Sequence, residues 1–186
     1  MISLPATRLS SDDYLAYDDG TDSRYELEDG ELLLMNPPTG RPALIIRLLS
    51  TTFEAEIQQS NLPWVSLQML GVRTAPRRSR LPALCVVSLE VVRELLDVSA
   101  VIESGAVLVV KIVSPESMKR DYRFKRAEYA AFGIPEYWIA DPATQKVTVL
   151  QLVEALYEDK EYQGGDRIES SIFPELNLTV AQVLQA

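Results

Sequence analysis

The sequence predicts a mixed α+β fold, in which a central β-sheet is flanked by helices. Segments of helix type and strand type alternate along the chain without an internal repeat. Residues 42–59 carry apolar side chains at helical spacing, whereas the runs 84–88 and 107–113 are short and rich in valine, which favours buried strands. The Asp29-Gly30 pair lies between two further apolar runs, an arrangement typical of a β-hairpin.

The bulk properties indicate one globular domain. The chain has 186 residues, of which 47% are hydrophobic and 24% charged, so we expect a single domain over residues 1–186. No apolar run approaches the ~20 residues of a membrane span, and no basic-then-apolar signal opens the chain, so we expect a cytoplasmic protein without membrane contact. The single cysteine, Cys85, lies in an apolar run and is expected to be a buried thiol.

Two features of the charged residues restrict the chemistry. The chain contains no histidine, which excludes Ser-His-Asp and Cys-His catalysis and every histidine-ligated zinc site. A metal ion would need oxygen ligands, as magnesium and manganese prefer. The net charge is −9, yet residues 73–126 hold 11 basic and six acidic residues, a net charge of +5. This distribution disfavours general polyanion binding but is compatible with a local phosphate-facing site.

The first third of the chain is expected to hold a short helix, a hairpin and a long helix. Ser10, followed by two aspartates, is typical of a helix N-cap. The hairpin joins strands at 24–27 and 32–35, and a proline-rich break separates it from the helix over 42–59.

The later elements are predicted by similar signals. Gly133 and Pro135 are typical of the end of a helix, which is expected over 116–132. A Gly-Gly turn indicates a hairpin between strands at 157–162 and 168–172. The remaining strands are expected at 64–72, 84–88, 107–113, 137–140 and 146–152, with a basic loop over 74–80 and short helices over 91–96 and 180–184.

One residue within the predicted sheet is unusual. Lys111 is the single charge inside the apolar run 107–113. A charge in a buried strand is costly unless it has a partner or a function. The functional question therefore centres on this strand and its neighbours.

Several blocks of the chain carry a family resemblance. They read RYELEDGELLLMNPP, RLPALCVVSLE, LVVKIVSPES and RDYRFKRAEYAAFGIPEYWIADP, in this order. With them the chain, from about Tyr14 to its C-terminus, resembles the bacterial putative restriction endonuclease family, also called the Uma-two family, of the PD-(D/E)XK nuclease superfamily. The resemblance implies a restriction-endonuclease-like fold, a mixed central sheet flanked by helices with additional hairpins, and magnesium- or manganese-dependent DNA cleavage. In such enzymes hard oxygen ligands hold the ion, which neutralises the phosphate and lowers the pKa of bound water.

The family's site residues map onto this chain unevenly. The resemblance places the early metal-binding glutamate at Glu26, and the aspartate and lysine of the following helix at Asp121 and Lys125. The two strand carboxylates, which are the principal metal ligands of the family, correspond to Ala83 and Lys111. Ala83 is therefore interpreted as a lost ligand, and only Glu26 remains as a weak metal ligand.

The role of Lys111 has three interpretations. Its ammonium could occupy the place of the metal and bridge Glu26 and Asp121. It could be a catalytic lysine of the E-x-K type, although Val109 then stands where the carboxylate belongs. It could also reach solvent from the strand end.

The roles of the remaining polar residues of the site also have more than one interpretation. Glu26 is either a leftover ligand or a surface residue of its strand. Asp121 and Lys125 are spaced i,i+4 and could be a solvated surface pair or part of the site. Arg120, Arg123 and Arg126 could contact phosphates, but they are interpreted as solubilising. The nucleic-acid contact is predicted in the basic loop, at Arg73, Arg77, Arg78 and Arg80.

Two classes of function follow from these residues. The favoured hypothesis is a catalytically degenerate nuclease fold without a cofactor, which binds DNA, pairs with a second copy or an active paralogue, or acts as a protein-interaction module. The alternative is an active endodeoxyribonuclease that holds magnesium or manganese with a rearranged carboxylate set, such as Glu26, Asp121 and Glu116. The apolar run Tyr137-Trp138-Ile139 is expected in the core or in an oligomer interface.

Overall fold

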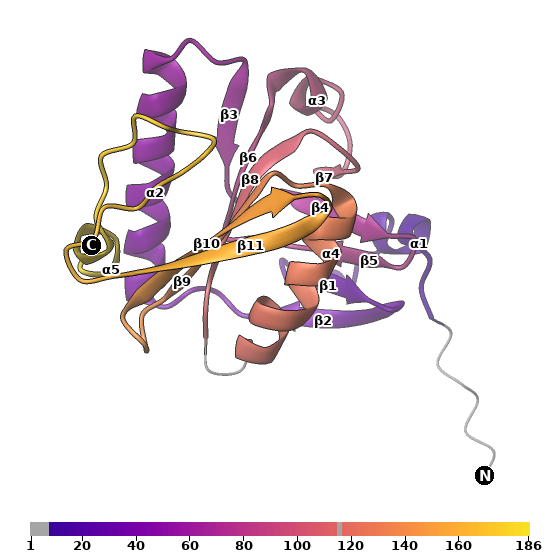
Figure 1. Ribbon diagram of the computed structural model, residues 1–186. Helices are drawn as coiled ribbons and strands as arrows, with labels where there is room; N and C mark the ends of the chain where they lie inside the picture. The colour runs from indigo at the N-terminus through magenta and orange to yellow at the C-terminus, as the bar shows by residue number, and fades with distance from the viewer. Residues whose placement is uncertain (1–7, 115–116) are drawn as a thin grey trace.

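The structure, a computed structural model, describes residues 8–114 and 117–186, and its strands form two sheets (Figure 1). The first sheet has the strand order β2-β1-β5-β4-β7, and the second has the order β11-β10-β9-β8-β6-β3. Helices flank the sheets, so the predicted mixed α+β class is confirmed.

The first sheet is built from short strands. The hairpin of its first two strands turns at Asp29 and Gly30, both of which have positive φ, as a two-residue hairpin turn requires. The predicted hairpin is therefore confirmed. The strands are β1 (Arg24–Glu28), β2 (Glu31–Met35), β4 (Gly71–Ala75), β5 (Arg78–Arg80) and β7 (Val101–Ile102).

The second sheet is larger and supplies the core of the molecule. Its strands are β3 (Trp64–Leu67), β6 (Leu84–Ser88), β8 (Ala106–Ile112), β9 (Glu136–Asp141), β10 (Lys146–Val153) and β11 (Leu156–Gln163). β8 and β9 pair in parallel, whereas the other pairs are antiparallel. A parallel pair needs a crossover connection, and here the crossover carries a helix.

The helices are of very different lengths. They are α1 (Ser11–Leu15), α2 (Gly40–Gln59), α3 (Leu89–Arg93), α4 (Lys125–Phe132) and α5 (Val180–Leu184), with a π-helical turn, η1 (Arg120–Phe124), directly before α4. Ser10 forms the predicted N-cap of α1, and Gly133 ends α4 in the left-handed conformation. In the part of the chain that the structure describes, none of the helices could span a bilayer.

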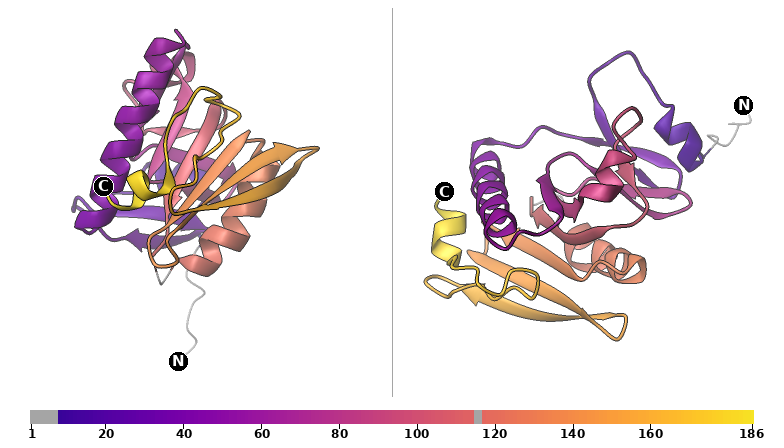
Figure 2. Two further views of the ribbon diagram at one scale, coloured as in Figure 1. Left: turned by 60° about the vertical axis from the view of Figure 1, so that its left-hand side comes forward. Right: turned by 90° about the horizontal axis from the view of Figure 1, so that it is seen from above.

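Two apolar layers cover the two faces of the second sheet. α2 and α5 lie on one face and α4 on the other (Figure 2). On the α2 side, Phe53 packs edge-to-face on Trp138, with ring centroids 5.4 Å apart, and stacks on Phe173 at 5.2 Å. On the α4 side, Tyr129 meets Tyr137 edge-to-face at 5.0 Å. Tyr137 and Trp138 are fully buried, so their run belongs to the core.

Two expectations for residues 64–80 are wrong. The single strand expected over 64–72 is two strands, β3 and β4, which belong to different sheets. Met69, with a φ of 62°, lies in the turn between them. The basic segment 74–80 is a hairpin of β4 and β5 rather than a loop, because its backbone pairs across the turn at Pro76 and Arg77.

Two later expectations also need correction. Residues 168–172 form no strand with β11, which instead pairs along its whole length with β10. The helix expected over 116–132 appears, from Arg120 on, as the π-helical turn η1 followed by α4. Glu116 lies outside the described residues. Cys85 is fully buried as expected, and burial raises the pKa of its thiol to about 12.

Candidate functional site

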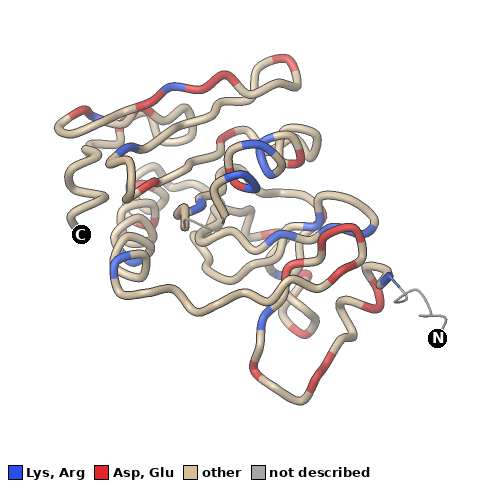
Figure 3. Tube along the Cα trace, turned by 90° about the horizontal axis from the view of Figure 1, so that it is seen from below, with Lys and Arg blue, Asp and Glu red and all other residues tan. Residues whose placement is uncertain are grey.

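A cleft of about 1520 Å³ brings together residues of both sheets and of the η1–α4 segment. Its lining includes two acidic residues, Asp22 and Glu26. Its basic residues are Arg24, Arg41, Lys111, Arg120 and Lys125. The cleft is thus net basic within a chain of net charge −9, whose acidic residues are prominent along β11 and in the N-terminal segment (Figure 3).

Glu26 is a buried carboxylate at the bottom of this cleft. It projects from β1 and is only 1% exposed. Its Oε1 accepts hydrogen bonds from the backbone N–H of Leu81 at 3.0 Å and from Nζ of Lys125 at 2.9 Å. Burial alone would raise the pKa of Glu26, but the ammonium groups of Lys125 and Lys111 more than offset it, so the pKa is lowered. Glu26 is therefore an ionised member of the site and not a surface residue.

Lys125 bridges the two remaining carboxylates of the site. Its Nζ lies 2.9 Å from Oε1 of Glu26 and 3.3 Å from Oδ1 of Asp121, and all three side chains are buried. Asp121 stands in η1, and its Oδ2 also accepts a hydrogen bond from the hydroxyl of Ser117. π-helical turns are frequent at functional sites. The structure thus excludes the interpretation of Asp121 and Lys125 as a solvated surface pair.

Lys111 lies beside this cluster without bridging it. It projects from β8 into the cleft and forms no ion pair within 4.0 Å with a described carboxylate. The prediction that its ammonium bridges Glu26 and Asp121 is therefore wrong, because Lys125 occupies that position. Burial and the positive charge of Lys125 lower the pKa of Lys111.

Ala83 lies next to Lys111 at the cleft wall. The pair Leu84–Val110 is the last in the antiparallel register of β6 and β8, and the N–H of Ala83 donates to the carbonyl of Val110 at 2.8 Å. The next positions along both strands are Ala83 and Lys111, and both line the cleft. The two positions that the resemblance assigns to metal ligands are thus adjacent in space, and neither carries a carboxylate.

Arg80 is not a surface contact for nucleic acid, contrary to the prediction. Its side chain is fully buried, and Nε and Nη2 each donate to a carboxylate oxygen of Glu128 at 2.7 Å. Nη1 lies 3.4 Å from both Glu26 and Glu28. This geometry makes Arg80 the internal counterion of the acidic residues around the cleft.

The other predicted arginines of the hairpin are partly or fully exposed, and Arg78 also lies 3.7 Å from the buried Glu128. Arg73 pairs with Glu103, and Arg78 pairs with Asp29 at 2.7 Å. Arg77 is exposed in the turn between β4 and β5. None of the four hairpin arginines is among the residues that line the cleft. The structure therefore keeps Arg73, Arg77 and Arg78 out of the cleft lining, whereas Arg80 contacts Glu26 from the interior.

The described residues do not fit a divalent metal ion. Residues 8–114 and 117–186 contain no group of three or more acidic or cysteine side chains arranged to hold one. Magnesium needs at least one or two well-placed carboxylates. Here Glu26 and Asp121, the two buried carboxylates at the cleft, already contact an ammonium, and Asp22 is exposed. The rearranged set that includes Glu116 involves a residue outside the described part of the chain.

Two residues of the site were missed from the sequence. Glu128 anchors Arg80, and Arg120 lines the cleft. Glu128 could have been found, since it continues the helical spacing of Asp121 and Lys125 on one face. Arg120 was interpreted from the sequence as solubilising, but its position in η1 places it in the cleft lining.

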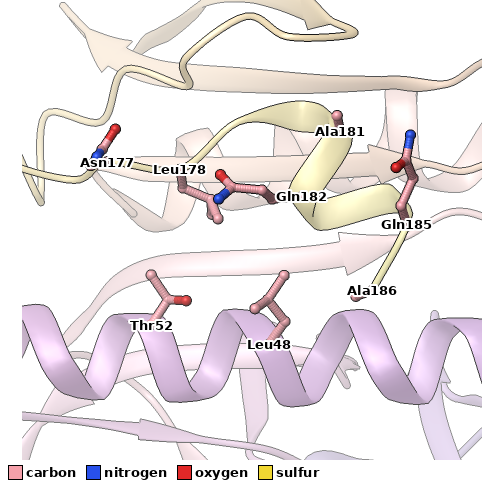
Figure 4. Close-up of a pocket in the computed structure, with 8 residues that line it drawn as sticks. All are labelled: Leu48, Thr52, Asn177, Leu178, Ala181, Gln182, Gln185 and Ala186. Atoms are coloured by element: carbon pink, nitrogen blue, oxygen red, sulfur yellow. The ribbon is translucent and has the colours of Figure 1, made fainter.

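A second pocket, of about 480 Å³, lies between α2 and α5 (Figure 4). The side chains that line it are aliphatic, hydroxyl or amide groups, such as Leu48, Thr52 and Gln182, and none is charged. It offers no acid, base or nucleophile of unusual environment, so the basic cleft remains the candidate site.

Comparison with known proteins identifies the family and the fold of the chain. The sequence model of the family described as "Putative restriction endonuclease" matches residues 11–181. Among solved structures, the chain is similar to a putative nuclease belonging to DUF820 from Anabaena variabilis, with a TM-score of 0.78 and 16% identity over 95% of this chain and 98% of that one. Comparison with curated proteins finds no match. The family match spans nearly the whole chain, and the similar structure shares its fold, so this chain belongs to the putative restriction endonuclease family.

Proposed function

We propose that this protein is a catalytically degenerate member of its family, which binds nucleic acid in the basic cleft without metal-dependent cleavage. One observation carries the proposal. The ammonium of Lys125 contacts both Glu26 and Asp121, at 2.9 and 3.3 Å. The two strand positions that the family resemblance assigns to metal ligands hold Ala83 and Lys111.

The charge of the cleft supports binding in place of hydrolysis. Five basic and two acidic residues line it, so an anionic backbone would meet a positive surface in an otherwise acidic chain. Hydrolysis would need a group that activates water, and Glu26, as the buried partner of an ammonium, is poorly placed to take up a proton.

The test is nicking of supercoiled plasmid with manganese. We expect no nicking by the natural protein. Ala83→Asp/Lys111→Glu should gain manganese binding, measured by calorimetry, and some nicking, because it supplies two adjacent carboxylates at the cleft wall. The matched control is Ala83→Asn/Lys111→Gln, which has the same side-chain sizes without the charges and should gain neither. Manganese-dependent nicking by the natural protein, lost in Glu26→Ala, would instead indicate an active enzyme with another ligand set.

Binding is tested separately with labelled duplex DNA. We expect an affinity that falls with rising salt, because the contacts are to phosphates. Lys111→Met should reduce this affinity and its salt dependence, whereas Arg77→Met in the hairpin turn should change both little. Equal binding by the natural protein and Lys111→Met would exclude the cleft as the binding surface.

The proposal also covers the cellular location and the oligomeric state of the protein. We propose a cytoplasmic protein, a view supported by a single buried thiol and no other cysteine in the chain. Pairing with a second copy or with an active paralogue would give a degenerate member a role in a larger assembly. Light scattering on the purified protein distinguishes monomer from dimer.

A further inference from the structure

Four of the five basic residues that line the cleft form no ion pair with a described carboxylate, and two of them, Lys111 and Arg120, act on each other beside the buried Lys125. Lys111 and Arg120 both line the cleft, and neither forms an ion pair within 4.0 Å with a described carboxylate. Nε of Arg120 is buried and has no described hydrogen-bond acceptor. Buried donors normally have a partner, so an acceptor bound in the cleft would satisfy this N–H.

The surroundings of Lys111 favour an additional anion. Arg120 and Asp121 of η1, Lys125 of α4 and Glu26 of β1 are the charged groups that act on it. Both carboxylates are already engaged by Lys125. The net effect of burial and of the neighbouring cations is a lowered pKa of Lys111, so its charge is not fully compensated.

We propose that Lys111 and Arg120 form a subsite for a terminal phosphate group of a nucleic acid strand. The inference rests on the proposed function, since it takes the cleft as the nucleic-acid site. A terminal phosphate carries about −1.5 to −2 charges at pH 7, which matches two cations. An internal phosphodiester carries one charge and would leave one cation uncompensated. The guanidinium can bind two phosphate oxygens at once, and the ammonium supplies a compact positive charge where the family holds a metal ion.

The test uses one oligonucleotide in three forms, with a 5′-phosphate, a 3′-phosphate or hydroxyl groups at both ends. Fluorescence anisotropy at fixed salt measures the affinity for each. We expect one phosphorylated form to bind about tenfold tighter than the hydroxyl form, as a charge-assisted contact would give. Lys111→Met and Arg120→Met should remove this difference, and Lys111→Arg should keep it. Arg123→Met, in the same turn but exposed, is the matched control and should keep it too.

The outcomes separate this inference from the proposed function. Equal binding of all three forms would overturn the subsite while leaving nucleic-acid binding intact. If no form binds, calorimetry with inorganic phosphate tests whether the subsite binds a free phosphate compound instead of the end of a nucleic acid strand. Phosphate binding that Lys111→Met abolishes would support the subsite, with a free phosphate compound as its ligand. Absence of phosphate binding as well would overturn both proposals. Circular dichroism of each variant controls for folding.

Discussion

At the scale of single residues, the buried ammonium of Lys125 holds together two carboxylates that would otherwise repel each other. Glu26 and Asp121 lie on different elements, β1 and η1, yet both contact the same Nζ. Breaking a buried ion pair leaves an uncompensated charge and is far more costly than losing a surface pair. The site residues are therefore also stability residues.

Glu26→Gln should destabilise the fold by about 3 kcal/mol, the lower end of the range for a broken buried pair, since Asp121 still faces Lys125. Urea unfolding measures the change. Glu103→Gln, which breaks the exposed pair with Arg73, is the control and should cost less than about 1 kcal/mol. Equal losses of unfolding free energy in the two variants would show that the buried Glu26–Lys125 pair stabilises the fold no more than an exposed pair does.

The pH dependence of stability provides a second prediction for Glu26. Its folded-state pKa lies below the usual 4.5, so the ionised carboxylate stabilises the fold above that pH. This contribution is lost as the pH falls below about 4.5 and through the folded-state pKa. The stability difference between the natural protein and Glu26→Gln should therefore be full at pH 7 and shrink under acid. A difference that stays constant down to pH 3 would contradict the lowered pKa.

At the scale of elements, a buried carboxylate ties β9 to the segment before the C-terminal helix. Glu136 is fully buried and accepts hydrogen bonds from the indole N–H of Trp138, the hydroxyl of Ser170, and both the N–H and the hydroxyl of Ser171, at 2.6 to 2.7 Å. These bonds explain why residues 168–172 form no strand, because their polar groups turn toward Glu136. The sequence signals of a hairpin were outweighed by this tertiary contact.

Glu136→Gln should destabilise the protein by about 1–3 kcal/mol, because the amide NH2 group would face hydrogen-bond donors and leave them unpaired. Urea unfolding again measures the change. Glu158→Gln on the exposed side of β11 is the control and should be close to neutral. A neutral Glu136→Gln would mean that the segment is held by its apolar residues alone.

The hairpin of β4 and β5 shows how secondary structure determines where the side chains of a basic segment point. As a loop, its arginines were expected to share one surface. As strands, the side chains alternate between two faces. Arg73 is paired with Ser79 on one face, whereas Arg78 and Arg80 lie on the other, where both reach Glu128 and only Arg80 is fully buried. A cluster of basic residues in the sequence therefore gave a basic turn and an internal counterion instead of one binding surface.

At the scale of the whole molecule, α4 connects the two sheets. It packs on the second sheet through Tyr129 and pairs with the first sheet through Lys125–Glu26 and Glu128–Arg80. We propose on this basis that residues 1–186 form one domain and one folding unit. Calorimetry should show a single transition, with a calorimetric enthalpy equal to the van't Hoff enthalpy. Two separate transitions would indicate that the sheets fold independently.

The sequence by itself determined the fold class, the family and most of the helices and strands. These depend on hydrophobic periodicity, turn residues and long ordered motifs, all of which are local properties of the chain. Through the family resemblance it also predicted that Glu26, Ala83, Lys111, Asp121 and Lys125 share one site, and the structure brings these residues together.

Only the tertiary structure decided which charges meet. Lys125 rather than Lys111 bridges the carboxylates, Arg80 is internal, and Arg120 faces the cleft. Ion pairs between β1, β5 and α4 join residues 48 to 99 positions apart in the sequence. Their geometry depends on the turn of η1 and on the packing of α4 against both sheets. No local pattern in the sequence encodes those distances, which is why the fold could be predicted while the pairing within the site could not.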